Sequence, residues 1–180
     1  MKKKVLAVIN QKGGVGKTTT VINLAASLSI LGQKNLVIDL DPQGNATSGL
    51  GHSNNNEKEN IYNLLIKKLS ISEAIQTTKI KDLDIIGSNL NLSGLEVETA
   101  NDSNRAFKLK EIINKNEEIL SKYDNIFIDC PPSLSLLTVM ALVSSEELLV
   151  PLQAEFFALE GISQLVKTIE RIKVNLNPTL

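Results

Sequence analysis

The sequence predicts an α/β fold in which a mostly parallel, twisted β-sheet carries helices on both faces. Short apolar runs of strand length, at residues 5–9 and 35–40, alternate along the chain with segments of helical periodicity. These runs are continuously apolar, which is typical of central parallel strands buried on both faces. A glycine-rich loop joins the first run to the first helical segment, as in a right-handed βαβ unit.

The composition indicates an ordinary globular domain. The chain has 180 residues, of which 42% are hydrophobic, and 19 Lys+Arg against 20 Asp+Glu give a net charge of −1. A single domain spanning residues 1–180 is expected, large enough to fold without a disulfide or structural metal. The lone Cys130 excludes an internal disulfide and a cysteine-based zinc site, and is expected to be a small buried packing residue. The near-neutral charge argues against nucleic-acid binding through bulk charge alone.

The pattern of apolar residues predicts a strand and then a helix at the start of the chain. Three lysines precede the apolar run at residues 5–9, which is too short for a secretory signal or a membrane-spanning helix. A short buried strand and a cytoplasmic protein are therefore expected. Val21, Leu24, Ala25 and Leu28 share one helix face, and this helix should end near Gly32.

The rest of the chain continues the alternation. Residues 41–56 are polar and rich in Gly and Asn, so they should form a functional loop or be partly disordered. Further helices are expected over residues 61–68, after Ser70 or Ser72, and over 103–121, 136–143 and 159–174, with strands over 83–86, 125–129 and 147–151. Phe156 and Phe157 are expected in the core or at an interface.

The loop after the first strand has the composition of a phosphate-binding site. Its residues are Lys12, Gly13, Gly14, Val15, Gly16, Lys17, Thr18 and Thr19. Glycines allow consecutive N–H groups to face phosphate oxygens, and the following helix N-terminus adds partial positive charge. Lys17 can reach the β- and γ-phosphates, the Thr18 hydroxyl can bind Mg²⁺, and Thr19 can donate to the α-phosphate. A merely flexible turn with surface lysines is the disfavoured alternative.

Three aspartates are expected beside this loop. Asp39 and Asp41 follow the second strand, and Asp129 ends a later one, so all three lie at the carboxyl edge of a parallel sheet, where ligands bind. Strand alternation sends Asp39 and Asp41 to the same side. Asp129 and Asp39 are candidate Mg²⁺ ligands, and Asp41 is the candidate that orients an attacking water. A turn at Asp41 and a helix cap at Asp129 are the structural alternatives.

The loop departs from the usual phosphate-loop pattern, because Gln11 stands where a glycine is usual and Lys12 opens the loop. With this second lysine, the sequence resembles the P-loop ATPases that have a deviant Walker A motif, the ParA/MinD group. The segment at residues 10–20, followed by Asn23-Leu24-Ala25, and the Asp-Pro-Gln-Gly-Asn segment at 41–45 resemble the ParA/Soj branch.

The resemblance implies a function. Lys12 would reach across a nucleotide-sandwich homodimer to the partner's ATP, residues 41–45 would be switch I with Asp41 as its hydrolysis-linked acid, and residues 130–133 would belong to switch II. It further implies a cytoplasmic, nucleoid-associated ATPase that uses ATP and Mg²⁺, binds DNA non-specifically and responds to a ParB/Spo0J-type partner, without a membrane. A ParA/Soj protein would continue beyond residue 180, so the C-terminal third, with the basic DNA-facing surface, is expected to be missing.

The sequence fits other functions less well. A MinD-like positioning ATPase is disfavoured by the segment at residues 41–45, and a small-molecule kinase by the two-lysine loop. A truncated nucleotide-binding remnant without DNA activity remains open. The chain begins at its first strand, so an N-terminal helix-turn-helix domain and operator binding are not expected.

Overall fold

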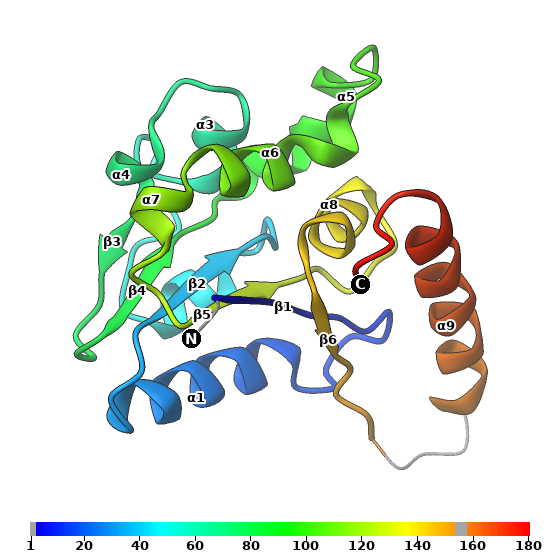
Figure 1. The fold of residues 1–180 in the computed structure, drawn as a ribbon, viewed down its shortest axis with the longest axis horizontal. Coiled ribbons are helices and arrows are strands. Elements are labelled where there is room, and N and C mark those ends of the chain that lie inside the picture. Colours follow the sequence, from blue (N-terminus) through cyan, green and yellow to red (C-terminus); the bar gives the residue numbers. More distant parts are fainter. Residues whose placement is uncertain (1–2, 154–157) are drawn as a thin grey trace.

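The computed structural model describes residues 3–153 and 158–180. A six-stranded sheet with the order β3-β4-β2-β5-β1-β6 runs through the molecule (Figure 1). Its strands are β1 (Lys4–Val8), β2 (Asn35–Asp39), β3 (Gln76–Thr77), β4 (Leu83–Ile86), β5 (Asn125–Asp129) and β6 (Glu147–Leu149). Neighbouring strands are parallel except β3 and β4, which are antiparallel. The predicted fold class is therefore confirmed.

Helices flank this sheet on both sides. They are α1 (Lys17–Ile30), α2 (Asn45–Gly49), α3 (Ile61–Leu65), α4 (Ile71–Ala74), α5 (Leu95–Glu98), α6 (Lys108–Lys115), α7 (Glu117–Leu120), α8 (Leu136–Ser144) and α9 (Ala158–Asn175), with the 3₁₀ turns η1 (Leu90–Gly94) and η2 (Arg105–Phe107). In Figure 1, α1 lies along one face, and α6 and α8 lie on the other. No helix in the described ranges is both long and apolar enough to span a membrane.

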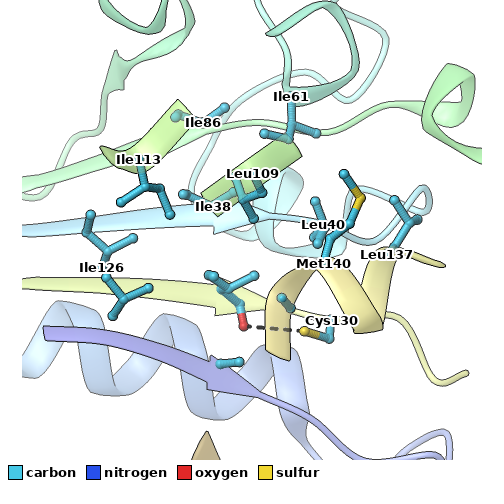
Figure 2. Close-up of a cluster of buried hydrophobic side chains, with 14 of the residues drawn as sticks. Ile38, Leu40, Ile61, Ile86, Leu109, Ile113, Ile126, Cys130, Leu137 and Met140 are labelled. Atoms are coloured by element: carbon cyan, nitrogen blue, oxygen red, sulfur yellow. Dashed lines mark hydrogen bonds between the residues drawn. The ribbon is translucent and has the colours of Figure 1, made fainter. Parts of the chain in front are cut away.

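Each central strand supplies both faces with apolar side chains, because successive side chains point to opposite sides. Val8, Val37 and Phe127 pack in a cluster with side chains of α1 and α2. Ile38 and Ile126 pack on the opposite face, in the larger cluster that includes α6 and α8 (Figure 2). Nearly continuous apolar strands are therefore required by a sheet covered on both sides.

The strand register aligns the carboxyl ends of the three central strands. Val8 of β1 pairs with Asp129 of β5, and Asp39 of β2 pairs with the same residue from the other side. The loops that follow β1, β2 and β5 therefore leave the sheet at the same edge. This edge carries every residue that the sequence marks as a candidate for nucleotide chemistry.

The observed elements differ from the expected ones in several places: η1 and α5 were not expected, and the strand expected over 147–151 ends at Leu149. The polar stretch at 41–56 contains α2, so it is partly helical, and the two-residue strand β3 was not foreseen. The charged segment at 103–121 forms η2, α6 and α7 rather than one helix. Regular helix is interrupted at Asn116, where α6 ends and α7 begins; its backbone N–H and its side-chain amide both donate to the Ile112 carbonyl, at 3.2 and 2.8 Å. Phe156 and Phe157 lie outside the described residues.

Candidate functional site

The loop between β1 and α1 has the backbone conformation that its glycines predict. Gly14 and Gly16 have φ values of 74° and 90°, in the left-handed region that favours glycine. Gly16 precedes α1, and no side chain caps the helix there. A Cβ added at Gly13, Gly14 or Gly16 would meet no atom within 4 Å. The N-terminal N–H groups of α1 therefore adjoin open space, as anion binding requires.

Neighbouring segments hold the loop in place. The Asn10 side chain donates to the Pro151 carbonyl at 2.8 Å and accepts from the Lys12 N–H at 2.9 Å. Gln153, which follows β6, donates from its side chain to the Gly14 carbonyl at 3.2 Å. Contacts to the start and to the middle of the loop thus come from the segment after β6, 139 or more residues away along the chain.

The two lysines of the loop differ in exposure. Lys17 is only 7% exposed, and its Nζ donates to the Lys12 carbonyl at 3.2 Å, so it folds back over the loop. The side chain of Lys12 is exposed. A buried ammonium is favourable only beside negative charge or acceptors, so Lys17 is suited to the bound anion itself. Lys12 instead extends a positive charge at the surface.

A cavity of about 480 Å³ adjoins the loop. Its lining residues are Gly13, Gly14, Gly16, Lys17, Thr18, Thr19, Ile22, Asp41, Asn45 and Pro132. The structure therefore brings most of the predicted loop residues together with Asp41, but Lys12 and Val15 do not line the cavity, and Val15 is buried. Sequence reasoning missed Ile22 and the roles of Asn45 and Pro132, although the last two belong to the motifs at 41–45 and 130–133.

Thr18, which lines the cavity, forms a pair with Asp129. The Thr18 hydroxyl donates to Asp129 Oδ2 at 2.7 Å, and Asp129 Oδ1 is buried with no hydrogen-bond partner among the described residues. Burial, followed by the charge of Asp39, raises the pKa of Asp129 to about 7, while the Thr18 hydrogen bond opposes this rise. A hydroxyl beside an unsatisfied carboxylate oxygen is the oxygen chemistry that Mg²⁺ prefers, so these residues fit a magnesium ion.

Asp39 and Asp41 do not share a side of a strand, because β2 ends at Asp39 and Asp41 lies beyond it. Asp39 is fully buried; its Oδ1 accepts from the Asp41 N–H at 3.1 Å, and its Oδ2 accepts from the N–H and hydroxyl of Thr47 at 2.8 and 2.7 Å. Burial raises the pKa of Asp39 to about 6, although the Thr47 hydrogen bonds oppose it. Only Asp41 lines the cavity, and a metal-ligand role for Asp39 stays a prediction.

Cys130 lies directly after Asp129 and is 1% exposed. Its thiol faces the larger hydrophobic cluster, near Met140 of α8, and contacts the Ile128 carbonyl at 3.8 Å (Figure 2). Burial, the largest of several causes, raises the pKa of the thiol above its usual value. The expected packing role of Cys130 is confirmed, and the thiol is unsuited to act as a nucleophile.

Comparison with known proteins extends this picture. Residues 3–180 match the AAA_31 family, described as an AAA domain. The chain is 46% identical over 177 residues to the chromosome partitioning protein ParA of Myxococcus xanthus (strain DK1622), covering 98% of this chain and 62% of that protein. It is 43% identical over 177 residues to the sporulation initiation inhibitor protein Soj of Bacillus subtilis (strain 168), covering 98% of this chain and 69% of Soj.

A solved structure shares the fold over nearly the same range. Cobyrinic acid a,c-diamide synthase from Mycobacterium smegmatis, with bound ATP analog and magnesium, superposes with a TM-score of 0.92 at 36% identity, covering 99% of this chain and 69% of that chain. The present chain thus spans about two thirds of the length of the proteins that it matches. Because the family match and both partitioning relatives extend over almost all of the present residues, the chain belongs to the AAA domain family, in its ParA/Soj group.

Proposed function

We propose that this chain is the nucleotide-binding part of an ATP-dependent dimerisation switch that hydrolyses ATP slowly with Mg²⁺. In this role it would segregate chromosome or plasmid DNA in the cytoplasm, on the nucleoid, through non-specific DNA binding and a ParB-type partner. The similarity to partitioning proteins supports the cellular role, and the geometry of the loop supports the chemistry. The basic surface used on DNA is expected beyond the present residues.

Each residue of the site has a defined task in this proposal. The loop N–H groups and the Lys17 ammonium hold the phosphates, and Asp41 orients the attacking water at the edge of the cavity. The Thr18 hydroxyl and the Asp129 carboxylate hold Mg²⁺, Asp129 through water. When bound, Mg²⁺ neutralises negative charge that develops on the phosphates.

The observation that carries the switch is the contrast between the two lysines. Lys17 is buried in its own loop, whereas Lys12 is exposed and does not line the cavity. A cation in this position can complete a nucleotide site across an interface, in the manner of an arginine finger supplied in trans. ATP would then control assembly, because hydrolysis requires Lys12 of the partner subunit.

Calorimetry and phosphate release test the nucleotide chemistry. Lys17→Ala should abolish ATP binding, whereas Lys79→Ala, which removes an exposed lysine of the β3–β4 turn, should leave it unchanged. Asp41→Ala should retain ATP but hydrolyse little of it. Unchanged ATP affinity in Lys17→Ala would refute the phosphate-loop assignment, and wild-type turnover in Asp41→Ala would remove its catalytic role.

Sizing in the presence of DNA tests the cellular role. With Mg²⁺·ATP, a chain extended over the full length of its relatives should bind plasmid DNA of any sequence as a dimer and release it after hydrolysis. If the extended chain binds nucleotide but neither dimerises nor binds DNA, the alternative of a nucleotide-binding remnant is correct.

A further inference from the structure

We infer that Asp39 and Thr47 form a positioning pair that fixes the backbone around Asp41, and that Asp39 does not ligate magnesium. This inference rests on the proposed ATPase function and adds two residues that act through Asp41. It begins from the partners of Asp39, whose two carboxylate oxygens accept three hydrogen bonds from Asp41 and Thr47. A carboxylate that is fully buried and engaged on both oxygens by its own chain has little capacity left for a metal.

The donors and acceptors around Thr47 define the direction of each bond. The Ser88 N–H donates to Thr47 Oγ1 at 2.8 Å, and a backbone N–H can only donate. The single hydroxyl proton of Thr47 is therefore directed to Asp39 Oδ2, 2.7 Å away. Thr47 is 2% exposed and Ser88 is also 2% exposed, so neither group can exchange its partner for bulk water. The chain of bonds joins β2, α2 and the end of β4.

Close packing holds α2 in the same place. A Cβ added at Gly49 would lie 2.5 Å from Ile22 Cδ1 of α1, and one added at Gly87 would lie 3.0 Å from Thr47 Cγ2. At the other end of the segment, Gly44 has φ of 63°, and a Cβ there would lie 2.7 Å from Asn54 Cβ. The helix thus packs against Ile22 of α1 and against Gly87 after β4, where an added Cβ would require the Ile22 or Thr47 side chain to shift.

Asp41 lies between two fixed points. Its N–H donates to Asp39 on the strand side, and its carbonyl accepts from the Gly44 N–H at 2.9 Å, immediately before α2 begins. Its own Oδ1 accepts from the Gln43 N–H at 2.9 Å, which orients the carboxylate within this turn. Loss of the Asp39–Thr47 bond would release one of the fixed points, and a displacement of about 1 Å at a reacting group can cost about 100-fold in rate.

Two substitutions at Thr47 separate positioning from binding. Thr47→Val keeps the shape and removes the hydroxyl, whereas Thr47→Ser keeps the hydroxyl. Thr47→Val should lower kcat by about 10- to 100-fold. The Kd for Mg²⁺·ATP should stay within about threefold of wild type, whereas loss of a hydrogen bond to the ligand itself would raise the Kd about tenfold. Thr47→Ser should retain most of kcat. The matched control is Thr99→Val. It also removes a buried threonine hydroxyl, but this hydroxyl donates to the Leu95 carbonyl and not to Asp39.

A double variant and hydrogen exchange complete the test. Thr47→Val should add no further loss of turnover to Asp41→Ala, because both changes act on the same step. Amide exchange of residues 41–45 should be faster in Thr47→Val than in wild type and unchanged in Thr99→Val. This second readout needs no turnover, so a wild-type protein that fails to hydrolyse ATP would refute the proposed function while exchange still decides the positioning role.

The outcomes that would overturn the inference are specific. Wild-type kcat in Thr47→Val, or unchanged exchange of residues 41–45, would show that Thr47 does not position Asp41. A metal-ligand role for Asp39 predicts instead that Asp39→Asn weakens Mg²⁺·ATP binding and that excess Mg²⁺ restores turnover. The positioning role predicts that Mg²⁺ at any concentration leaves the turnover of Asp39→Asn low.

Discussion

Lowering the pH from 8 to 5.5 should weaken the Mg²⁺-dependent part of nucleotide binding, because Asp129 takes up a proton. Burial and the nearby charge of Asp39 raise the pKa of Asp129 to about 7. A carboxyl group must lose its proton to hold a cation through water, so the proton and Mg²⁺ compete for the same site. The Mg²⁺-dependent affinity should therefore rise with pH through about 7 and become constant above it.

The size of the effect follows from the pKa. At pH 5.5 the carboxyl would be about 1.5 pH units below its pKa of about 7, so only about one group in 30 is ionised. The competition should then reduce the Mg²⁺-dependent gain in affinity by about 30-fold, or about 2 kcal/mol. A carboxyl with the ordinary pKa near 3.9 would show almost no change over this range.

The assay is calorimetric titration of ADP with Mg²⁺ and with EDTA at several pH values between 5.5 and 8.5. The ratio of the two dissociation constants gives the Mg²⁺-dependent gain. Asp129→Asn serves as the control, because in this variant the nucleotide phosphates still titrate but the side chain at position 129 does not. Identical pH profiles for wild type and Asp129→Asn would refute the assignment of Asp129 to the magnesium site.

Three further predictions concern stability, measured by urea denaturation. The folded pKa of Asp39, about 6, lies above its ordinary 3.8, so the folded state is favoured at low pH. The free energy of unfolding should therefore fall by about 2 kcal/mol as pH rises from 4 to 7; Asp39→Asn should flatten this slope, and an unchanged slope would contradict it. Gly16→Ala should cost about 1–2 kcal/mol because φ is 90°, and a neutral effect would show that the loop relaxes. Leu109→Ala, at 1% exposure, should cost about 2–5 kcal/mol yet leave ATP affinity unchanged below its unfolding midpoint; a weaker affinity would link this core to the site.

The placement of the candidate site residues was largely predictable because two strong signals coincide. The apolar runs fix three central strands, and parallel strands place their carboxyl ends at one edge. The glycines and lysines of the loop identify the ligand chemistry at that edge. Thr18 and Asp129 are 111 residues apart, yet the register of β1 and β5 is sufficient to bring them together.

Details that depend on individual polar contacts were not predictable. The helix α2 has only five residues and follows Gly44, and Asp39 bonds to Thr47 eight positions later, which no hydrophobic pattern marks. Strand alternation does not extend to Asp41, because β2 ends at Asp39, and the Asp41 N–H instead donates to the Asp39 carboxylate. The break between α6 and α7 at Asn116 is likewise not marked by the hydrophobic pattern.

The mass of the protein in the presence of Mg²⁺·ATP tests the switch most directly. Light scattering should give a dimer for wild type and for Lys79→Ala with Mg²⁺·ATP, a monomer for both with Mg²⁺·ADP, and a monomer for Lys12→Ala with either nucleotide. Calorimetry should show that Lys12→Ala still binds ATP. A Lys12→Ala protein that forms an ATP-dependent dimer would contradict the role of this lysine across the interface.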